Sequence, residues 1–259
     1  MPRMSAHSRC QVVCAGERMK IFLSALESHG VNICNNIGKL KWNLMSFYYL
    51  KQPVFERVLQ HSELMLIDSG AHSFQKGKKV DWVEYTKKYA EWIRANDCPK
   101  ILGYFEMDVD NAIGYDKVLQ LRAILEQSSD KIIPVWHKNR GVNEFKKMCQ
   151  QYAGKIVAIT GFRNEDIKDH QYLMFLKYAK KYGCKVHCLG MTRKEILDKV
   201  PFDYVDSSSW VQRGAYARIG NRKVNSDFAR ANVKRVFLEN YKLAMEMQKY
   251  YYKRWNQYE

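Results

Sequence analysis

The chain has 259 residues, 46% of them hydrophobic, which is enough for one large domain with a full apolar core. Lys and Arg number 43 against 27 Asp and Glu, a formal net charge of +16. This excess disfavours a basic partner and favours a polyanion such as nucleic acid. The 17 Tyr and 6 Trp residues support the same interpretation, because bases stack on aromatic rings. A merely solubilising basic surface is the alternative.

The seven cysteines are scattered, with no paired framework and no zinc-ligand spacing, which indicates reduced thiols. No apolar run approaches the ~18 residues of a membrane span. The first 18 residues lack the apolar stretch of a signal peptide. We therefore expect a cytoplasmic protein without membrane contact. We also expect residues 1–18 to be a poorly ordered lead-in and residues 19–259 to form a single domain.

Short apolar runs alternate with longer amphipathic segments along the chain. The runs predict strands at Met19–Leu26, Leu64–Ile67, Ile101–Met107, Lys131–Trp136, Ile156–Thr160, Lys185–Leu189 and Tyr204–Val205. The candidates for an eighth strand are Tyr216–Ile219 and the segment near Val31–Ile33. Strand and helix in this alternation are typical of parallel βαβ units. We therefore predict an α/β fold, a (β/α)8 TIM-type barrel.

The amphipathic segments predict helices between these strands. They lie at Asp81–Asn96, Tyr115–Glu126, Val142–Tyr152, Asp169–Tyr182 and Thr192–Val200. Asp81 is the expected N-cap of the first of them. A long C-terminal helix, rich in Lys, Arg and Tyr, is expected from about Ser226 to Trp255.

The residues at or just after the ends of most predicted strands are mainly polar residues and glycines. They are Asp68-Ser69-Gly70, Asp108, His137, Thr160-Gly161, Leu189-Gly190-Met191 and Asp206. Each alone is an ordinary turn or cap residue, but the carboxyl ends of barrel strands all face one mouth. Two carboxylates there suit glycosidic chemistry, in which one attacks the anomeric carbon and the other handles the proton of the base. Such chemistry requires no metal and no cofactor, and we expect neither.

Five ordered segments carry a family resemblance. They are Asp68–Gln75, Phe105–Asp110, Ala158–Gly161, Lys185–Met191 and Val205–Trp210. The chain resembles the tRNA-guanine transglycosylase superfamily from about Met19 to about Arg222. Within that superfamily it is most similar to the short DNA-modifying deazaguanine transglycosylases of phages and bacterial genomic islands. The resemblance implies a location in the cytoplasm of a bacterial cell or a phage-infected host.

The resemblance also implies roles for residues. Asp206 is the expected nucleophile, in preference to nearby Asp203, and Asp68 the general acid/base. Asp108 is expected to recognise the N1–H and amine of guanine, with Glu106 and Asp110 as neighbouring alternatives. The expected substrate-binding residues are Ser69, Gly70, Phe74, Asp108, His137, Thr160, Gly161, Leu189, Gly190, Met191 and Trp210. His137 stands where the family has Gln, and it is interpreted equally well as a wall of the base site or as a catalytic group.

Two departures favour DNA over tRNA as the nucleic acid. No cysteine follows Cys188, so the zinc site of the tRNA enzymes is missing, and no added RNA-binding domain is seen. A 7-deazaguanine base is the expected small-molecule substrate. Four basic residues close behind Asp206 are expected to contact the nucleic acid: Arg213, Arg218, Arg222 and Lys223.

Three alternatives stay open on the sequence. One is the same exchange on tRNA, of the queuosine or archaeosine type. Another is a non-catalytic barrel that binds nucleic acid or a deazapurine. The third is hydrolysis, with water in place of the incoming base. The 7-substituent, the target sequence, the need for a protein partner and the oligomeric state are not determined by the sequence.

Overall fold

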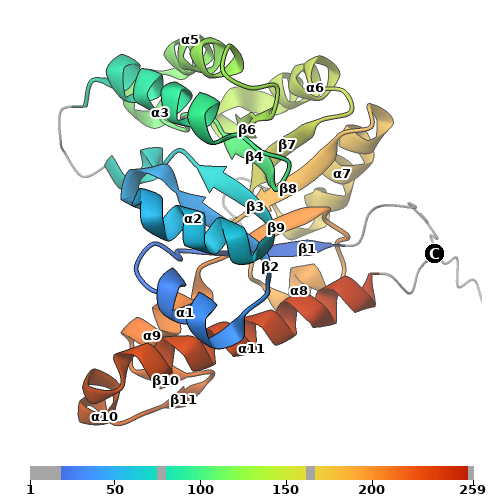
Figure 1. Cartoon of the computed structure of the whole chain (residues 1–259). Helices are drawn as coiled ribbons and strands as arrows, with labels where there is room; N and C mark the ends of the chain where they lie inside the picture. The colour runs from blue at the N-terminus through green and yellow to red at the C-terminus, as the bar shows by residue number, and fades with distance from the viewer. Residues whose placement is uncertain (1–18, 75–79, 162–166, 256–259) are drawn as a thin grey trace, which may run out of the picture.

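A computed structural model describes residues 19–74, 80–161 and 167–255 (Figure 1). The expected lead-in, residues 1–18, and Gln75 lie outside these ranges. Nine strands within them form one parallel sheet in the order β5-β4-β3-β2-β1-β9-β8-β7-β6. They are β1 Lys20–Ser24, β2 Leu40–Ser46, β3 Ser62–Asp68, β4 Ile101–Phe105, β5 Ile132–Ile133, β6 Val135–Trp136, β7 Ile156–Thr160, β8 Lys185–Leu189 and β9 Tyr204–Ser207.

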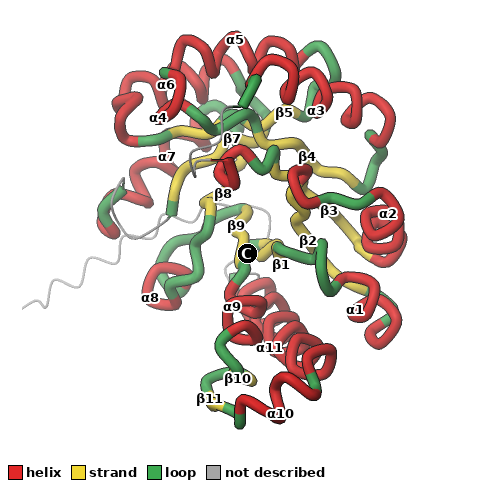
Figure 2. Tube along the Cα trace, turned by 90° about the vertical axis from the view of Figure 1, so that its left-hand side faces the viewer, coloured by secondary structure: helices red, strands yellow, loops and turns green. Residues whose placement is uncertain are grey.

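The two ends of this sheet meet at Pro134. On one side of Pro134, β5 pairs with β4, and on the other side β6 pairs with β7. Proline has no N–H for the ladder, but the Pro134 carbonyl still accepts from the Ala158 N–H at 2.9 Å. β5 and β6 are therefore two halves of one strand position, and the sheet closes as a barrel of eight positions. The predicted (β/α)8 TIM-type barrel is confirmed, and Figure 2 shows helices surrounding the strands.

All seven predicted strands are present, but both candidates for the eighth were wrong. Val31–Ile33 lies in a helix, and Arg218–Ile219 (β10) pairs with Arg222–Lys223 (β11) in a separate hairpin. The missing strand is β2, which pairs with β1 and β3. Its sequence, LKWNLMS, is not a continuous apolar run, because it contains the polar residue Asn43, and the strand was therefore not predicted. In the structure Asn43 is fully buried and donates to the Ser62 hydroxyl at 2.8 Å.

Helices fill the connections between the strands. They are α1 Gly30–Ile37, α2 Gln52–His61, α3 Trp82–Asn96, α4 Asp110–Ile113, α5 Tyr115–Glu126, α6 Gly141–Gln151, α7 Tyr172–Lys181, α8 Lys194–Leu197, α9 Ser209–Ala215, α10 Ser226–Ala231 and α11 Val233–Arg254. Short 3-10 turns lie at Phe47–Tyr49, Ala71–Phe74, Lys138–Arg140 and Asp169–Gln171.

Every predicted helix is present, whereas α1, α2, α4 and α9 were not predicted. Asp81 caps α3, because its side chain accepts from the Glu84 N–H at 3.0 Å. α5 has the predicted bounds, whereas α8 is shorter than predicted. The long C-terminal helix is present as α11, but it is separated from α10 at Asn232. No helix in the described part of the chain is both long and apolar enough to cross a bilayer.

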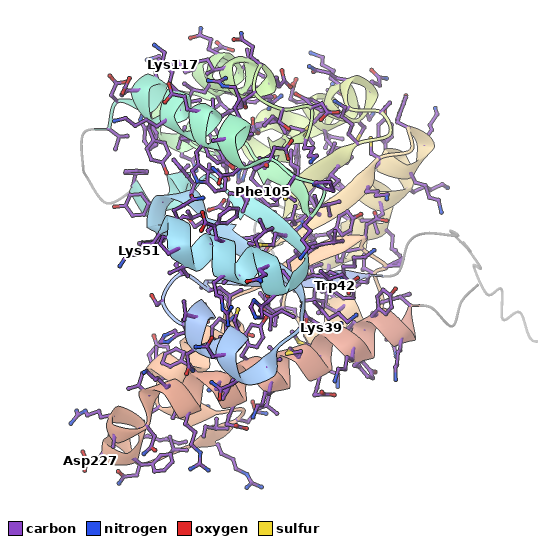
Figure 3. All side chains as sticks on the ribbon, in the orientation of Figure 1. Lys39, Trp42, Lys51, Phe105, Lys117 and Asp227 are labelled. Atoms are coloured by element: carbon purple, nitrogen blue, oxygen red, sulfur yellow. The ribbon has the colours of Figure 1, made fainter. Side chains whose placement is uncertain are left out.

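α11 lies along the strands where the barrel begins and ends. Gln248 is buried and donates to the carbonyls of Ile21 and Trp42 at 2.7 and 2.9 Å. Tyr241 is also buried, and its hydroxyl donates to Asn43 at 2.6 Å. These bonds satisfy polar groups that would otherwise be unpaired in the core. Inside the barrel, buried apolar side chains pack around Phe105 (Figure 3). The barrel is therefore filled, and a site is expected at its mouth.

Candidate active site

The carboxyl ends of the strands bring several ionisable side chains to one mouth. Asp68 ends β3, Asp108 follows β4, His137 follows β6 and Asp206 lies in β9. Burial, together with the charges of Asp206, Asp108 and Glu27, raises the pKa of Asp68 to about 7 against the lowering effect of a backbone hydrogen bond from Gly70. This electrostatic coupling means that carboxylates from distant parts of the sequence lie near one another.

Asp68 is held by the tight turn that follows it. Its Oδ2 accepts from the Gly70 N–H at 2.9 Å. Gly70 has φ +75°, and an added Cβ would lie 2.3 Å from the Cβ of Tyr48, so no other residue fits there without rearrangement. Ser69 is buried and donates to the Glu106 carbonyl at 2.9 Å. Ser69 and Gly70 therefore fix the turn that directly follows Asp68.

Asp206 is 15% exposed and is fixed by two bonds to the same oxygen. Its Oδ1 accepts from the Gly190 N–H at 2.8 Å and lies 3.0 Å from Nε2 of His187. His187 is fully buried, with the rings of Phe22 and Phe105 at 6.3 and 5.0 Å. Within the described ranges, none of the hydrogen bonds found involves Oδ2. The carboxylate is thus oriented through Oδ1, and no donor in the described ranges is bonded to Oδ2.

The loops after β7 and β8 are tied together beside Asp206. The Gly161 N–H donates to the Leu189 carbonyl at 2.9 Å. An added Cβ on Gly161 would lie 2.7 Å from Sγ of Cys188, so the absence of a side chain allows this close approach. Gly190, with φ +63°, turns its N–H toward Asp206. Met191 is buried, and Thr160 and Leu189 are half-buried at their strand ends.

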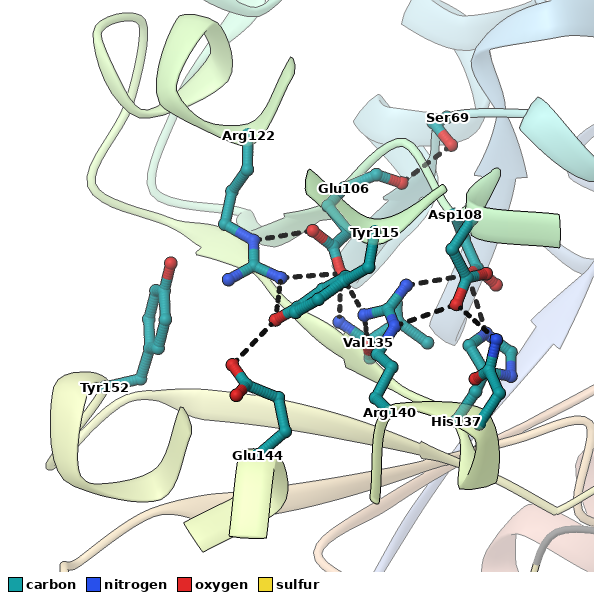
Figure 4. Close-up of polar contacts among 12 residues, drawn as sticks. Ser69, Glu106, Asp108, Tyr115, Arg122, Val135, His137, Arg140, Glu144 and Tyr152 are labelled. Carbon is teal, nitrogen blue, oxygen red and sulfur yellow. Dashed lines mark hydrogen bonds and ion pairs between the residues drawn. The ribbon is translucent and has the colours of Figure 1, made fainter. Parts of the chain in front are cut away.

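Asp108 is distinguished from its neighbours Glu106 and Asp110 by exposure. The exposed side-chain fractions of Glu106, Asp108 and Asp110 are 0%, 26% and 3%. Glu106 binds Arg122 at 2.6 Å and Arg140 at 3.2 Å, as Figure 4 shows. Asp110 binds Nε of Arg140 at 3.0 Å. Glu106 and Asp110 are therefore committed to buried arginines, and Asp108 is the acid of the three that remains accessible.

His137 and Arg140 flank Asp108. The Nε2 atom of His137 lies 2.6 Å from Asp108 Oδ1, and Nη2 of Arg140 lies 3.6 Å from the same oxygen. Burial opposes protonation of His137, but the hydrogen bond and charge of Asp108 outweigh it and raise the pKa of His137. Metal-ligating atoms of Asp108, Asp110 and His137 lie within 4.8 Å of one another. Arg140 already acts as the counter-ion of both aspartates in this cluster.

Several predicted residues are not brought to the mouth. Trp210 is fully buried, donates to the Ser24 carbonyl at 2.8 Å and packs 5.1 Å from Tyr241 of α11. Phe74 packs against Tyr48 and Tyr85 at 4.4 and 4.7 Å. Both side chains belong to aromatic packing clusters.

The four predicted nucleic-acid contacts lie on α9 and on the hairpin that follows it. Arg213 is half-buried on α9. Arg218, Arg222 and Lys223 are exposed on the β10–β11 hairpin, which lies outside the ring of strands (Figures 1 and 2).

Three residues of the mouth region were missed. Glu27, in the loop after β1, accepts from the Ser46 N–H at 2.5 Å, and burial raises its pKa. Its position directly after a predicted strand could have revealed it. His187 stands as one polar residue inside an apolar strand, a weaker signal. Arg140 has no signal of its own in the sequence, because its partners are set only by the closed barrel.

Comparison with known proteins adds little beyond the fold. No protein-family model matches the chain, and no curated protein does. Among solved structures, it is similar to mutant tryptophan synthase α-subunits of the hyperthermophile Pyrococcus furiosus, three of which have TM-scores of 0.46 to 0.47. Their identity to this chain is 14–15%, over 87–88% of this chain and 98% of theirs. The likeness concerns the fold alone, and the barrel assignment follows from the strand order of this chain.

Proposed function

We propose that the chain is an enzyme, a guanine transglycosylase that exchanges guanine in DNA for a 7-deazaguanine base. The observation that carries the proposal is the pair of aspartates at one mouth. Asp206 is oriented by two bonds to Oδ1, and Asp68 has a pKa raised to about 7 by burial. A carboxylate nucleophile beside a carboxyl that can exchange its proton near neutral pH suits a double displacement at a sugar carbon.

The reaction has two balanced steps. Oδ2 of Asp206 attacks C1′ of the target deoxyguanosine, the C1′–N9 bond breaks, and the departing guanine takes the proton held by Asp68. A 7-deazaguanine then enters, and Asp68 removes the proton from its N9. N9 attacks C1′, the ester bond to Asp206 breaks, and both aspartates return to their starting states. Two inversions retain the original configuration of the sugar.

Asp108 and His137 form the base-recognition side of the proposed site. Asp108 is 26% exposed, whereas its acidic neighbours are held by arginines. A carboxylate accepts from both the N1–H and the amine of guanine, which adenine does not offer. His137, bonded to Asp108, orients that carboxylate. Loss of guanine preference in Asp108→Ala is expected, and unaltered preference would contradict this role.

The polymer would present its target nucleotide by turning it out of the duplex, since the reacting carbon is otherwise inaccessible to a barrel mouth. The formal net charge of +16 supports a polyanionic substrate. DNA is preferred to tRNA because the chain resembles the zinc-less DNA-modifying branch.

The test is incorporation of radiolabelled guanine into duplex DNA, single-stranded DNA or unmodified tRNA. We expect label in DNA and none with Asp206→Asn. Asp203→Asn is the matched control, because Asp203 directly precedes β9 at its opposite end and accepts from the Val186 N–H at 2.8 Å. This variant should retain exchange.

Three other results would contradict parts of the proposal. Label in tRNA alone would change the polymer. Full exchange by Asp206→Asn would remove the nucleophile assignment. Bound nucleic acid without label in any polymer would favour the non-catalytic barrel.

A further inference from the structure

A strongly basic segment follows the candidate active site in the chain. Between residues 213 and 235 there is one acid, Asp227, and there are seven basic residues. The basic residues are Arg213, Arg218, Arg222, Lys223, Arg230, Lys234 and Arg235. All of them except Arg213 are exposed. This segment, from the end of α9 through the hairpin and α10 to the first turn of α11, is called the basic arm below.

The charge of the basic arm is almost uncompensated. In the described part of the chain, its one ion pair joins Arg230 to Asp227 at 3.7 Å, and both side chains are more than 80% exposed. Such an exposed pair contributes little binding energy. The arm therefore presents its positive charge to solvent and to any polyanion.

On the remainder of α11, exposed lysines are paired with acids, as on an ordinary solubilising surface. There Lys242 pairs with Glu239 at 2.9 Å and Lys249 pairs with Glu246 at 2.7 Å. The contrast within one helix argues against general solubility as the reason for the arm's charge, because solubility does not require the charges of one end to be left unpaired.

The arm is held rigidly on α11. Asn240 is fully buried, and its side chain accepts from the Gly220 N–H at 3.0 Å and donates to the Arg218 carbonyl at 2.6 Å. The ring of Phe237 fills the space where a side chain on Gly214 would lie, 2.7 Å from an added Cβ. A rigid scaffold lowers the entropy lost when its side chains bind a partner.

Aromatic rings accompany the basic side chains. Tyr216 is 75% exposed and Phe228 is 39% exposed. The guanidinium of Arg235 lies 6.0 Å from the centre of the Phe228 ring. Exposed rings beside arginines are typical of surfaces that contact nucleic acids, where they stack on bases and sugars.

The position of the arm decides which part of a polymer it can reach. α9 begins three residues after Asp206 and has seven residues, a length of about 10 Å. The hairpin and α10 extend beyond it, outside the barrel, and Asp227 marks their outer end (Figure 3). Since one strand of duplex DNA advances ~3.4 Å per nucleotide, the length of α9 corresponds to about three nucleotides, and the hairpin and α10 follow it in the chain.

We propose that the basic arm binds the phosphodiester backbone of DNA several nucleotides from the target base. It would thereby set the minimum length of an efficiently bound substrate. The proposal rests on the proposed function for the identity of the polymer, but not for the chemistry at the mouth.

The test measures binding alone, by fluorescence anisotropy with labelled duplexes of about 24 and about 6 base pairs around a central guanine, at several salt concentrations. Arg222→Gln/Lys223→Gln should bind the long duplex about tenfold more weakly, and the slope of log K against log salt should fall by about 2. The short duplex should bind both proteins equally. Lys242→Gln/Lys249→Gln, on the paired part of α11, is the matched control and should bind as the parent does.

Each outcome of this test supports or contradicts DNA binding by the arm independently of the proposed base exchange. Unchanged binding of the long duplex by the arm variant would overturn it. Equal losses on both duplexes would also overturn it, because they would place the contact at the target. Length-dependent loss on DNA without any base exchange would support the arm and contradict only the transglycosylase. The same length dependence on RNA, with tighter binding, would support the backbone contact and overturn the choice of DNA.

Discussion

The mouth and the basic arm are both rich in charged residues, but those of the mouth are buried in ion pairs and those of the arm are mostly exposed. At the mouth, Glu106, Asp110, Arg122 and Arg140 are buried and bound to one another. In the arm, the basic side chains other than Arg213 are exposed, and within the described ranges they are largely unpaired. Buried pairs fix geometry, because a misplaced charge there is costly, whereas exposed charges act at longer range and attract a polymer. The difference shows that paired charge fixes side-chain orientation at the mouth, whereas the exposed charge of the arm is available for the polymer binding that we propose.

The largest expected effect concerns the stability of the mouth. Glu106→Gln leaves Arg122 and Arg140 buried without their shared carboxylate. The free energy of unfolding should fall by about 3–5 kcal/mol, the cost of breaking a buried pair. Denaturant titration with an unchanged m-value measures this loss.

The control is Glu246→Gln, which breaks the exposed pair with Lys249 on α11. Its unfolding free energy should change by no more than about 1 kcal/mol. Equal effects of the two variants would remove the distinction between buried and exposed charge on which the comparison depends.

The sequence predicts most of the barrel because its parallel strands are short apolar runs between helices. It fails at β2, where Lys41 and Asn43 interrupt the run although Asn43 is buried and bonded to Ser62 and Tyr241. The tertiary partner that makes Asn43 acceptable in a strand lies on α11, far away in the sequence. No local pattern reveals such a partner.

The candidate site follows the same rule. Asp68, Asp108 and Asp206 could be selected because each lies at or just after a strand end, and strand ends share a mouth. Trp210 satisfies the same positional argument, yet its ring turns into the core against Tyr241. Position along the strand determines where the backbone of a residue lies, whereas the direction of a side chain depends on packing that only the closed barrel defines.

The next effect concerns the orientation of Asp206. His187→Phe removes the hydrogen bond to Asp206 Oδ1 and keeps a ring between Phe22 and Phe105. The rate of base exchange should fall about 10- to 100-fold, as expected for losing a bond to a charged group. Stability should be maintained, because Nδ1 of His187 has no hydrogen-bond partner among residues 19–74, 80–161 and 167–255, and its burial is unfavourable.

Single-turnover exchange and thermal unfolding of the His187 variants separate the two effects. His187→Gln, which can still donate to Asp206, should recover part of the rate. A rate that is unchanged in His187→Phe would mean that Gly190 alone orients the nucleophile.

A smaller effect is expected where the basic arm is anchored. Asn240→Ala removes the partners of the Gly220 N–H and the Arg218 carbonyl. The free energy of unfolding should fall by about 1–2 kcal/mol, and amide hydrogen exchange should accelerate in the hairpin while β1 and β9 stay protected. Uniform acceleration over the whole chain would contradict the view of the arm as a separately anchored unit.

The smallest effect is a pH dependence at Asp68. Burial and neighbouring charges raise its pKa from 3.8 to about 7, so the folded state holds the proton more tightly than the unfolded chain does. The stabilisation from this protonated carboxyl is complete below pH ~4 and is lost as the pH rises through about 7. Asp68→Asn lacks this dependence. Its melting temperature should therefore gain on the parent by about 2–4 °C between pH 6 and pH 7, where about 1 kcal/mol of this stabilisation is lost.

Asp227→Asn in the basic arm is the matched control for that pH dependence. The Asp227 side chain is 88% exposed, so solvent screens it and no comparable desolvation acts on it. Its melting-temperature difference from the parent should stay constant between pH 5 and pH 8. A gap for Asp68→Asn that is equally constant would mean that the Asp68 carboxyl is hydrated like that of Asp227. The mouth would then lack the buried proton donor that the proposed base exchange requires.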